Sequence, residues 1–311
     1  MSSDVVELSS AGGAMENSER YLPDRAESQR RQVWRRLVRH KLAMLGLLIL
    51  FVLVALSALV PLFAPYDRDR INLIQRFQAP SSEHWMGTDE LGRDVFTRIF
   101  YGGRISLSVG LLVAVSSTLV GGLVGVMSAY VGGWADEVIM RLIDIIRSLP
   151  AIAILIVLSY LLRARFDITG NLWTIVIILI VLGWTGIARI VRGVALSLKE
   201  QEFIMAAHAA GASPGRIIFV HLMPNALPPM IVATTLGAGA AISAESALSF
   251  LGLGIQPPTP SWGNMLFNAQ TYLWNEPWIA VFPGFFIFIT LLSFNFLGDG
   301  LRDALDPRQR T

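Results

Sequence analysis

The stretch LAMLGLLILFVLVALSALVPLFA, residues 42–64, carries no charged side chain from one end to the other. A helix needs about 20 mostly apolar residues to cross the hydrocarbon core of a bilayer, because only its internal hydrogen bonds satisfy the backbone there. The stretch therefore predicts a membrane-spanning helix. The whole chain agrees, since 53% of its 311 residues are hydrophobic and only 15% are charged, whereas soluble domains carry about 25% charged residues.

Five further runs predict spans at residues 105–131, 148–162, 168–188, 227–253 and 278–298. The run at 148–162 is short and must borrow the turns that hold Arg141, Asp144 and Arg147. Because these three charges lie three residues apart on one helical face, we expect them to neutralise one another at the cytoplasmic boundary. The expected fold is an all-α polytopic membrane protein with six transmembrane helices within residues 41–300.

Basic residues predict the orientation, because cytoplasmic loops carry an excess of lysine and arginine. The segment before the first span ends in a basic cluster formed by Arg30, Arg31, Arg35, Arg36, Arg39 and Lys41. With six spans it shares a side with the basic loop 196–226 and the tail 301–311, so residues 1–40 and both termini are expected in the cytoplasm. Loops 65–104 and 254–277 then face outward. The polar segment is too long for a cleaved secretory signal, so the first span is expected to remain.

Residues 26–41 predict an amphipathic juxtamembrane helix. Val33, Trp34, Leu37 and Val38 share one helical stripe, with arginines around it. Such a helix is typical of a segment lying on anionic membrane lipid. A solvated basic tail is the alternative, and the sequence does not decide between the two.

The residue inventory excludes several classes of function. The chain has no cysteine, and its four histidines show no metal-ligand spacing. Its two lysines, Lys41 and Lys199, do not follow a glycine, so a phosphate-binding loop is missing. We expect a non-catalytic chain that has no cofactor of its own and no nucleic acid partner.

Glu245 lies within the predicted fifth span. Ion pumps and proton-coupled carriers usually place several ionisable groups inside their spans. Glu245 either lines a polar pathway or is hydrogen-bonded between helices, with Ser243, Ser246 and Ser249 as possible partners. We favour the second, structural interpretation.

The loop at 196–226 predicts two short helices. The first is compatible with residues 198–210, Gly211 supplies a stop, and Ser213 with Pro214 supplies an N-cap and a first-turn proline. The second helix is expected to continue through Arg216 until Pro224. Such a pair suits the groove of another protein, although an ordinary loop packed under the bundle fits equally well.

This loop resembles the EAA loop of the permease subunits of binding-protein-dependent ABC importers. The resemblance rests on Met205-Ala206-Ala207, on Gly211 and on the run HLMPN at residues 221–225. Met205 stands where the family usually has glutamate, which bears on any ion pair made from that position. The resemblance implies an ATPase-coupling site at Glu202, Met205, Ala206, Ala207, Gly211, Ala212, Ser213, Arg216 and Pro224.

Two more segments are similar to the oligopeptide and dipeptide permeases of the C type. One is the outer-loop motif of Gly87, Thr88, Asp89, Gly92, Arg93 and Asp94, followed by residues 101–107. The other runs from Glu245 through LSFLGLG at residues 248–254 to PSWG at residues 260–263. The outer motif either docks a binding protein or forms a structural turn in which Asp89, Arg93 and Asp94 pair, and we favour the turn.

The resemblance implies the type I ABC importer permease fold in the cytoplasmic membrane of a bacterium. The expected partners are a second homologous permease, two ATPase subunits that bind ATP and Mg²⁺, and an extracytoplasmic binding protein that delivers peptides. Import would then proceed by alternating access.

Three alternatives remain. The same architecture could carry nickel or another metal chelate, glutathione or haem. A channel or secondary carrier without ATPases would be favoured by inverted repeats with broken helices and by intramembrane charges, neither of which is evident in the sequence. An intramembrane enzyme is least favoured, because His221 lies in the cytoplasmic loop.

Overall fold

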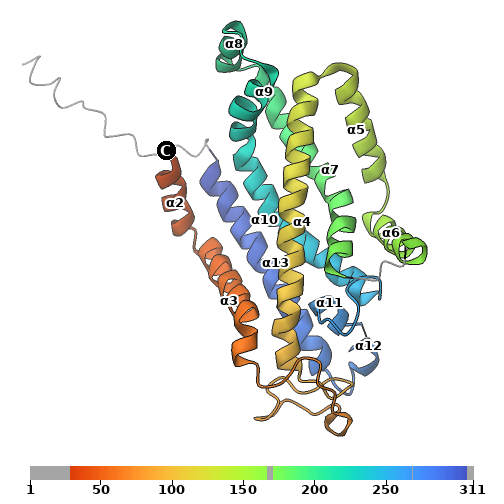
Figure 1. The fold of residues 1–311 in the computed structure, drawn as a ribbon. Coiled ribbons are helices and arrows are strands. Elements are labelled where there is room, and N and C mark those ends of the chain that lie inside the picture. Colours follow the sequence, from red (N-terminus) through yellow and green to blue (C-terminus); the bar gives the residue numbers. More distant parts are fainter. Residues whose placement is uncertain (1–28, 167–170, 268, 307–311) are drawn as a thin grey trace, which may run out of the picture.

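The computed structural model describes residues 29–166, 171–267 and 269–306. These residues form helices and loops, with one isolated bridge between Thr88 and Asp94 and no strand. Five stretches are long and apolar enough to cross a membrane, namely α3 (Lys41–Phe63), α4 (Val95–Val131), α7 (Leu172–Lys199), Pro214–Phe250 and α13 (Trp278–Leu305). They run along one another in a single elongated bundle (Figure 1). The all-α fold predicted from the apolar runs is confirmed.

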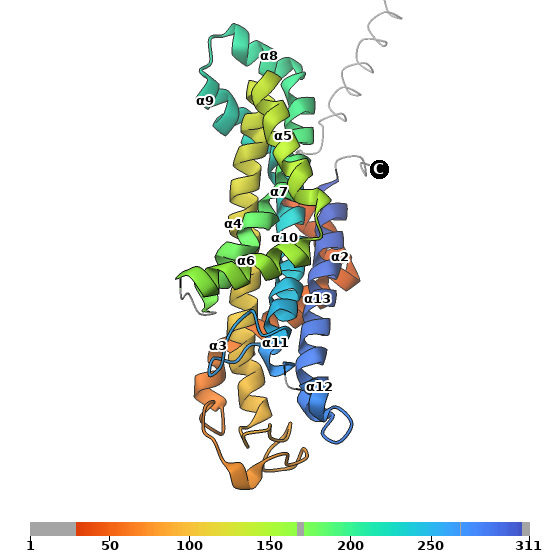
Figure 2. The same cartoon turned by 90° about the vertical axis from the view of Figure 1, so that its right-hand side faces the viewer.

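The third predicted span is broken. Residues 133–166 form α5 (Gly133–Ser148) and α6 (Ala151–Phe166), which meet at an angle of 91°. Pro150 causes the break, because proline lacks the N–H that a continuous helix needs and favours an extended preceding residue; Leu149 is extended, with ψ 147°. Figure 2 shows α6 lying across the bundle rather than along it. The count of six spans therefore holds only if this bent pair counts as one span.

The fourth long stretch joins three elements, α9 (Pro214–Arg216), the π-helical turn η3 (Ile217–Leu222) and α10 (Met223–Phe250). Before it lies α8 (Glu202–Ala209), which stands at one end of the bundle, opposite the loop that joins α3 to α4 (Figure 1). That loop contains the short helix η2 (Leu73–Gln75). The loop between α10 and α13 contains α11 (Trp262–Met265) and α12 (Ala269–Tyr272).

Glycines allow α4 and α7 to approach closely at the centre of the bundle. A Cβ atom at Gly121 would lie 2.5 Å from the carbonyl oxygen of Trp184, and one at Gly125 would lie 2.5 Å from that of Ala188. Small residues at such spacing permit helix backbones to pack together inside a membrane. The central position of α4 follows from this contact and from its packing against α10.

The juxtamembrane helix α2 (Gln29–Arg39) packs on the bundle. Leu37 is buried against Ala43 and Ala304, and Val33 packs against the same cluster. Trp34 is 59% exposed. The predicted apolar stripe is therefore divided, with one part held by α3 and α13 and the other available to a membrane surface. Residues 26–28 lie outside the described residues.

Candidate functional site

The bend after α8 has the geometry that its sequence predicts. Gly211 has φ +75°, the left-handed conformation that ends many helices. The backbone N–H of Ala212 donates to the carbonyl of Ala207 at 3.0 Å, which closes the last turn. Ser213 then caps α9, with Pro214 in its first turn. The predicted stop and restart at Gly211 are therefore confirmed.

The loop is anchored by buried isoleucines and presents its other face to the surroundings. Ile204, Ile217 and Ile218 are buried in a cluster with the C-terminal halves of α4 and α7. The exposed members of the predicted coupling set are Glu202, Met205, Ala206, Gly211, Ser213, Arg216 and Pro224, while Ala207 and Ala212 are partly buried. Met205 is 55% exposed and its neighbour Phe203 44%. Exposed apolar side chains at the far tip of the bundle are typical of a surface that another protein covers.

The prediction that the second helix ends at Pro224 is wrong. Pro224 is exposed and lies in the first turn of α10, which continues without interruption from η3. The backbone N–H of Met223 donates to the carbonyl of Ile218, five residues earlier, as in a π-helix. The widened turn directly before Pro224 lets the helix continue although proline supplies no N–H.

Side chains tie together the ends of α4, α5 and α7 beneath this loop. The Nζ of Lys199 donates to the carbonyl oxygens of Ala129 and Tyr130, at 3.4 and 3.0 Å. The guanidinium of Arg192 binds both carboxylate oxygens of Asp136, with 2.6 Å between Nε and Oδ1. These contacts fix the platform from which α8 projects.

The expectation that Asp144 is neutralised by its own helix is wrong. Asp144 pairs with Arg189 of α7, and Arg141 lies 3.9 Å from Glu137. Arg147, the third member of the expected set, makes no hydrogen bond or ion pair with any residue that the structure describes. The bend at Pro150 directs α5 along α7, which supplies a better partner for Asp144 than its own helix does.

In the loop between α3 and α4, Asp89 and Arg93 form a buried pair. The Nε of Arg93 lies 2.6 Å from Oδ2 of Asp89, and the Nε of Arg98 lies 3.5 Å from the same oxygen. The turns on either side depend on Gly87 and Gly92, which have φ +74° and +69°. The expected pairing of Asp89 with Arg93 is thus present, whereas Asp94, expected in the same pairing, binds His84 and the start of α4 instead.

Asp94 organises the start of α4. Its carboxylate accepts the backbone N–H of Thr97 at 2.7 Å, and its other oxygen lies 2.9 Å from Nδ1 of the buried His84. Thr88 is fully buried, and its carbonyl accepts the indole N–H of Trp278 at the beginning of α13. Because its side chains are occupied inside the chain, the motif fits the structural interpretation better than a docking surface.

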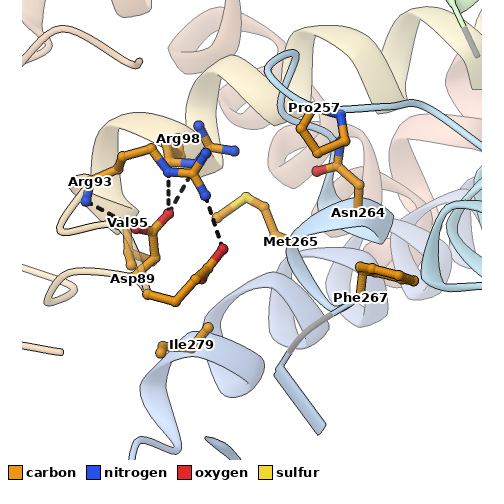
Figure 3. A pocket seen from close by; sticks show the side chains of 10 residues that line it. Asp89, Arg93, Val95, Arg98, Pro257, Asn264, Met265, Phe267 and Ile279 are labelled. Atoms are coloured by element: carbon orange, nitrogen blue, oxygen red, sulfur yellow. Dashed lines mark hydrogen bonds and ion pairs between the residues drawn. The ribbon is translucent and has the colours of Figure 1, made fainter. Parts of the chain in front are cut away.

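A cavity of about 50 Å³ separates this motif from the loop before α13. Figure 3 shows Arg98 and Asp89 on one side of it and Asn264 and Met265 of α11 on the other. Pro257 lines its upper edge in that view. The cavity can hold water but is too small for a peptide, so we assign it to the contact between the α3–α4 loop and the α10–α13 loop.

Glu245 ties α10 to α4. Its side chain is fully buried and accepts hydrogen bonds from Ser249 at 2.7 Å and Ser106 at 3.1 Å. The hydroxyl oxygen of Ser106 also accepts the backbone N–H of Trp262. These contacts link α4, α10 and α11, as the structural interpretation of Glu245 requires. Ser106 could not be identified as a partner from the sequence, because it lies far from Glu245 along the chain.

The described residues contain no group of three or more His, Asp or Glu side chains that could hold a metal ion. The features that the structure does show are the exposed loop at α8 and α9, the buried polar contacts of Asp89, Asp94 and Glu245, and the apolar helices. Residues 121–311 match the family described as the binding-protein-dependent transport system inner membrane component. The chain belongs to this permease family.

Relatives narrow its place within the family. Residues 28–80 match the N-terminal transmembrane domain of oligopeptide transport permease C. The dipeptide transport system permease protein DppC of Bacillus subtilis is 46% identical to this permease over 91% of the chain and 87% of the relative. DppC of Alkalihalophilus pseudofirmus is 42% identical over 92% of each. The predicted membership of the C-type oligopeptide and dipeptide permeases is confirmed.

A solved structure supports the fold. The permease superposes with a TM-score of 0.55 on a chain of the MetNI methionine ABC transporter in an inward-facing conformation. The match covers 67% of this permease and 96% of that chain at 21% identity. The permease therefore has the type I ABC importer fold.

Two residues of interest gave no clear signal in the sequence. Lys199 holds the end of α4 by donating to carbonyl oxygens about seventy residues away, and nothing near Lys199 in the sequence indicates this contact. His84 lacked a metal-ligand spacing, and its partner Asp94 is visible only once the outer loop is folded.

Proposed function

We propose that this permease is one of two homologous membrane subunits of an ATP-driven importer that carries di- or oligopeptides across the bacterial cytoplasmic membrane. The observation that carries the proposal is the exposed surface at the tip of the bundle, formed by α8, Gly211 and α9. It has apolar and charged side chains and a defined bend. The helix ends next to it are held together by Lys199 and by the pair of Arg192 and Asp136. In this proposal two partner ATPases bind ATP and Mg²⁺ and receive that surface in their grooves.

The mechanism is alternating access. Closure of the ATPase dimer around ATP moves the coupling segment, the spans rock, and the pathway between the two permeases opens to the outside, where a binding protein delivers cargo. Hydrolysis returns it to the inward-facing state. The loop must bind its partner differently in the two states, because a contact that is equal in both shifts no equilibrium. Both termini, the basic cluster and α8 lie in the cytoplasm in this arrangement.

The peptide cargo is supported by the relatives, several of which are described as dipeptide, oligopeptide or peptide permeases. Glutathione is the second candidate, since a glutathione transport permease of Pectobacterium atrosepticum is 37% identical over 90% of this chain. Both candidates are small molecules with peptide bonds and a free carboxylate, so the two proposals share their chemistry.

Affinity purification of the chain from mildly solubilised membranes tests this function. We expect a second permease and two ATPases to co-purify, with ATP hydrolysis stimulated by a binding protein loaded with trialanine. Stimulation by glutathione but not by trialanine would select the second candidate. A chain that elutes alone as a homo-oligomer without ATPase activity would overturn the proposal.

A further inference from the structure

An apolar hollow of about 460 Å³ lies between α4, α6, α7 and α10. Several small residues line it, among them Gly183 and Gly186 of α7 and Gly237 and Ala240 of α10. It is also lined by Val113, the middle residue of α4, so it lies halfway along the spans. Its volume falls within the range of about 300–1,000 Å³ that is typical of small-molecule sites.

Arg147 is the charged residue among the described side chains that line this hollow. It stands in the last turn of α5, directly before the 91° break that leads into α6. A Cβ atom at Gly186 would lie 2.9 Å from its Nη1 atom, so the guanidinium rests on the middle of α7. It also lines a neighbouring hollow of about 300 Å³ that contains Thr185.

Arg147 differs from Arg189 and Arg192 of α7 in its lack of a partner. Arg189 is paired with Asp144 and Arg192 with Asp136, whereas Arg147 has no hydrogen-bond or ion-pair partner within the described ranges. An ionisable side chain halfway along a span is costly and usually marks a substrate pathway. The free guanidinium therefore indicates an anionic ligand.

A carboxylate matches this group best, because a guanidinium presents parallel N–H donors that bind its two oxygens together. Every linear peptide with a free C-terminus carries one carboxylate in the same place, whatever its side chains are. The rest of the hollow is apolar and lined by small residues, which suits side chains of varied shape. The hollow thus offers one fixed contact for the carboxylate and discriminates little between peptides with different side chains.

We propose that Arg147 binds the C-terminal carboxylate of the peptide cargo within this hollow. The inference rests on the proposed function and adds to it a binding residue and a specificity rule, namely that a free C-terminus is preferred to an amidated one. An acidic side chain of the second permease is the competing partner of Arg147, and the experiment below separates it from the peptide carboxylate.

The test is equilibrium binding of radiolabelled trialanine and of its C-terminal amide to the assembled complex in nanodiscs, without ATP and without the binding protein. Leaving out the binding protein removes its own preference from the measurement. We expect the wild-type complex to prefer the acid by about ten- to a hundredfold, the usual strength of a hydrogen bond to a charged group. Arg147→Gln should bring the two affinities together without weakening amide binding.

Arg141→Gln is the matched control, because Arg141 lies on the same helix and is exposed but lines neither hollow. It should keep the wild-type preference. Ala240→Phe provides a second variant, which places a bulky side chain on the part of the lining that α10 supplies and should weaken binding of both peptides by at least about tenfold. This variant keeps the hollow testable if Arg147→Gln does not assemble.

Three binding results would overturn the inference. They are a wild-type complex without acid preference, an Arg147→Gln complex that keeps it, and an Ala240→Phe complex that binds both peptides as before. Loss of the second permease from Arg147→Gln but not from Arg147→Lys would also overturn it, by assigning Arg147 to the subunit interface. If trialanine stimulates ATP hydrolysis but Arg147→Gln keeps the wild-type preference for the acid over the amide, only this inference fails. If no peptide stimulates hydrolysis, the proposed function fails.

Discussion

Replacement of Gly211 tests whether the bend between α8 and α9 transmits force between ATPase and permease. Gly211 has φ +75°, and a Cβ atom built on it meets no other atom within 4 Å. A side chain at this position therefore encounters only the strain of its own backbone. Side chains differ in how much of that strain they tolerate, so a graded series of substitutions is available.

The expected magnitudes follow from the left-handed conformation. It costs an ordinary L-residue about 1–2 kcal/mol, and a β-branched residue falls at or above the upper end of that range. Asparagine tolerates the conformation far better. Coupling free energies between sites are typically about 1–3 kcal/mol. The strain in Gly211→Val is of the same size, so it should remove most of the coupling, while Gly211→Asn should retain it and Gly211→Ala should fall between.

The assay is the number of ATP molecules hydrolysed per trialanine imported by the complex in proteoliposomes. This ratio should rise several-fold in Gly211→Val and stay near the wild-type value in Gly211→Asn, with all subunits still co-purifying. Gly215→Val is the matched control, because Gly215 lies in the same exposed loop and also has open space around its Cβ position but has no positive φ.

Wild-type coupling in Gly211→Val, with assembly intact, would refute the reasoning. Equal defects in Gly211→Val and Gly211→Asn would refute it differently, since they would show that a close contact with the ATPase, rather than backbone strain, requires glycine.

Two further predictions concern the buried contacts around Gly92 and Glu245. Gly92→Ala should destabilise the loop between α3 and α4 by more than about 2 kcal/mol, because Gly92 has φ +69° and a Cβ atom there would lie 1.8 Å from the carbonyl oxygen of Asn72. Limited proteolysis of this loop should therefore accelerate. The control is Gly132→Ala, where φ is +66° but the space is open, and the acceleration should be far smaller. Glu245→Gln should preserve the thermal midpoint of the purified complex, whereas Glu245→Ala, which leaves the hydroxyl of Ser106 without its carboxylate acceptor, should cost about 2 kcal/mol or more. Equal midpoints for the two Glu245 variants would contradict the assigned role.

Local rules predicted a large part of the fold and of the loop. Uncharged runs locate helices in a membrane because hydrocarbon permits few other backbone structures. The bend at Gly211 was predictable because glycine, Ser213 and Pro214 each act on the two or three peptide units next to them. None of these inferences needs knowledge of what lies on the other side of the bundle.

The errors arose where distant contacts compete with local ones. Pro150 is visible in the sequence, yet hydropathy over a window does not indicate whether a proline bends a span slightly or by 91°. Asp144 has two arginines on its own helix, but Arg189 lies closer once α5 packs along α7. Pro224 ends a helix by the usual rule, and only the geometry of η3 shows how the chain continues past it.

The π-helical turn η3 has a consequence for the phase of the whole stretch Pro214–Phe250. A π-turn corresponds to one residue inserted into an α-helix, and each residue turns the helix by about 100°. Deleting a residue from η3 would therefore rotate α8 and α9 by about a quarter turn relative to the side of α10 that carries Glu245. The direction in which α8 and α9 point around the helix axis is thus set by the one extra residue of η3. A deletion in η3 would redirect them without changing any residue of α8 or α9.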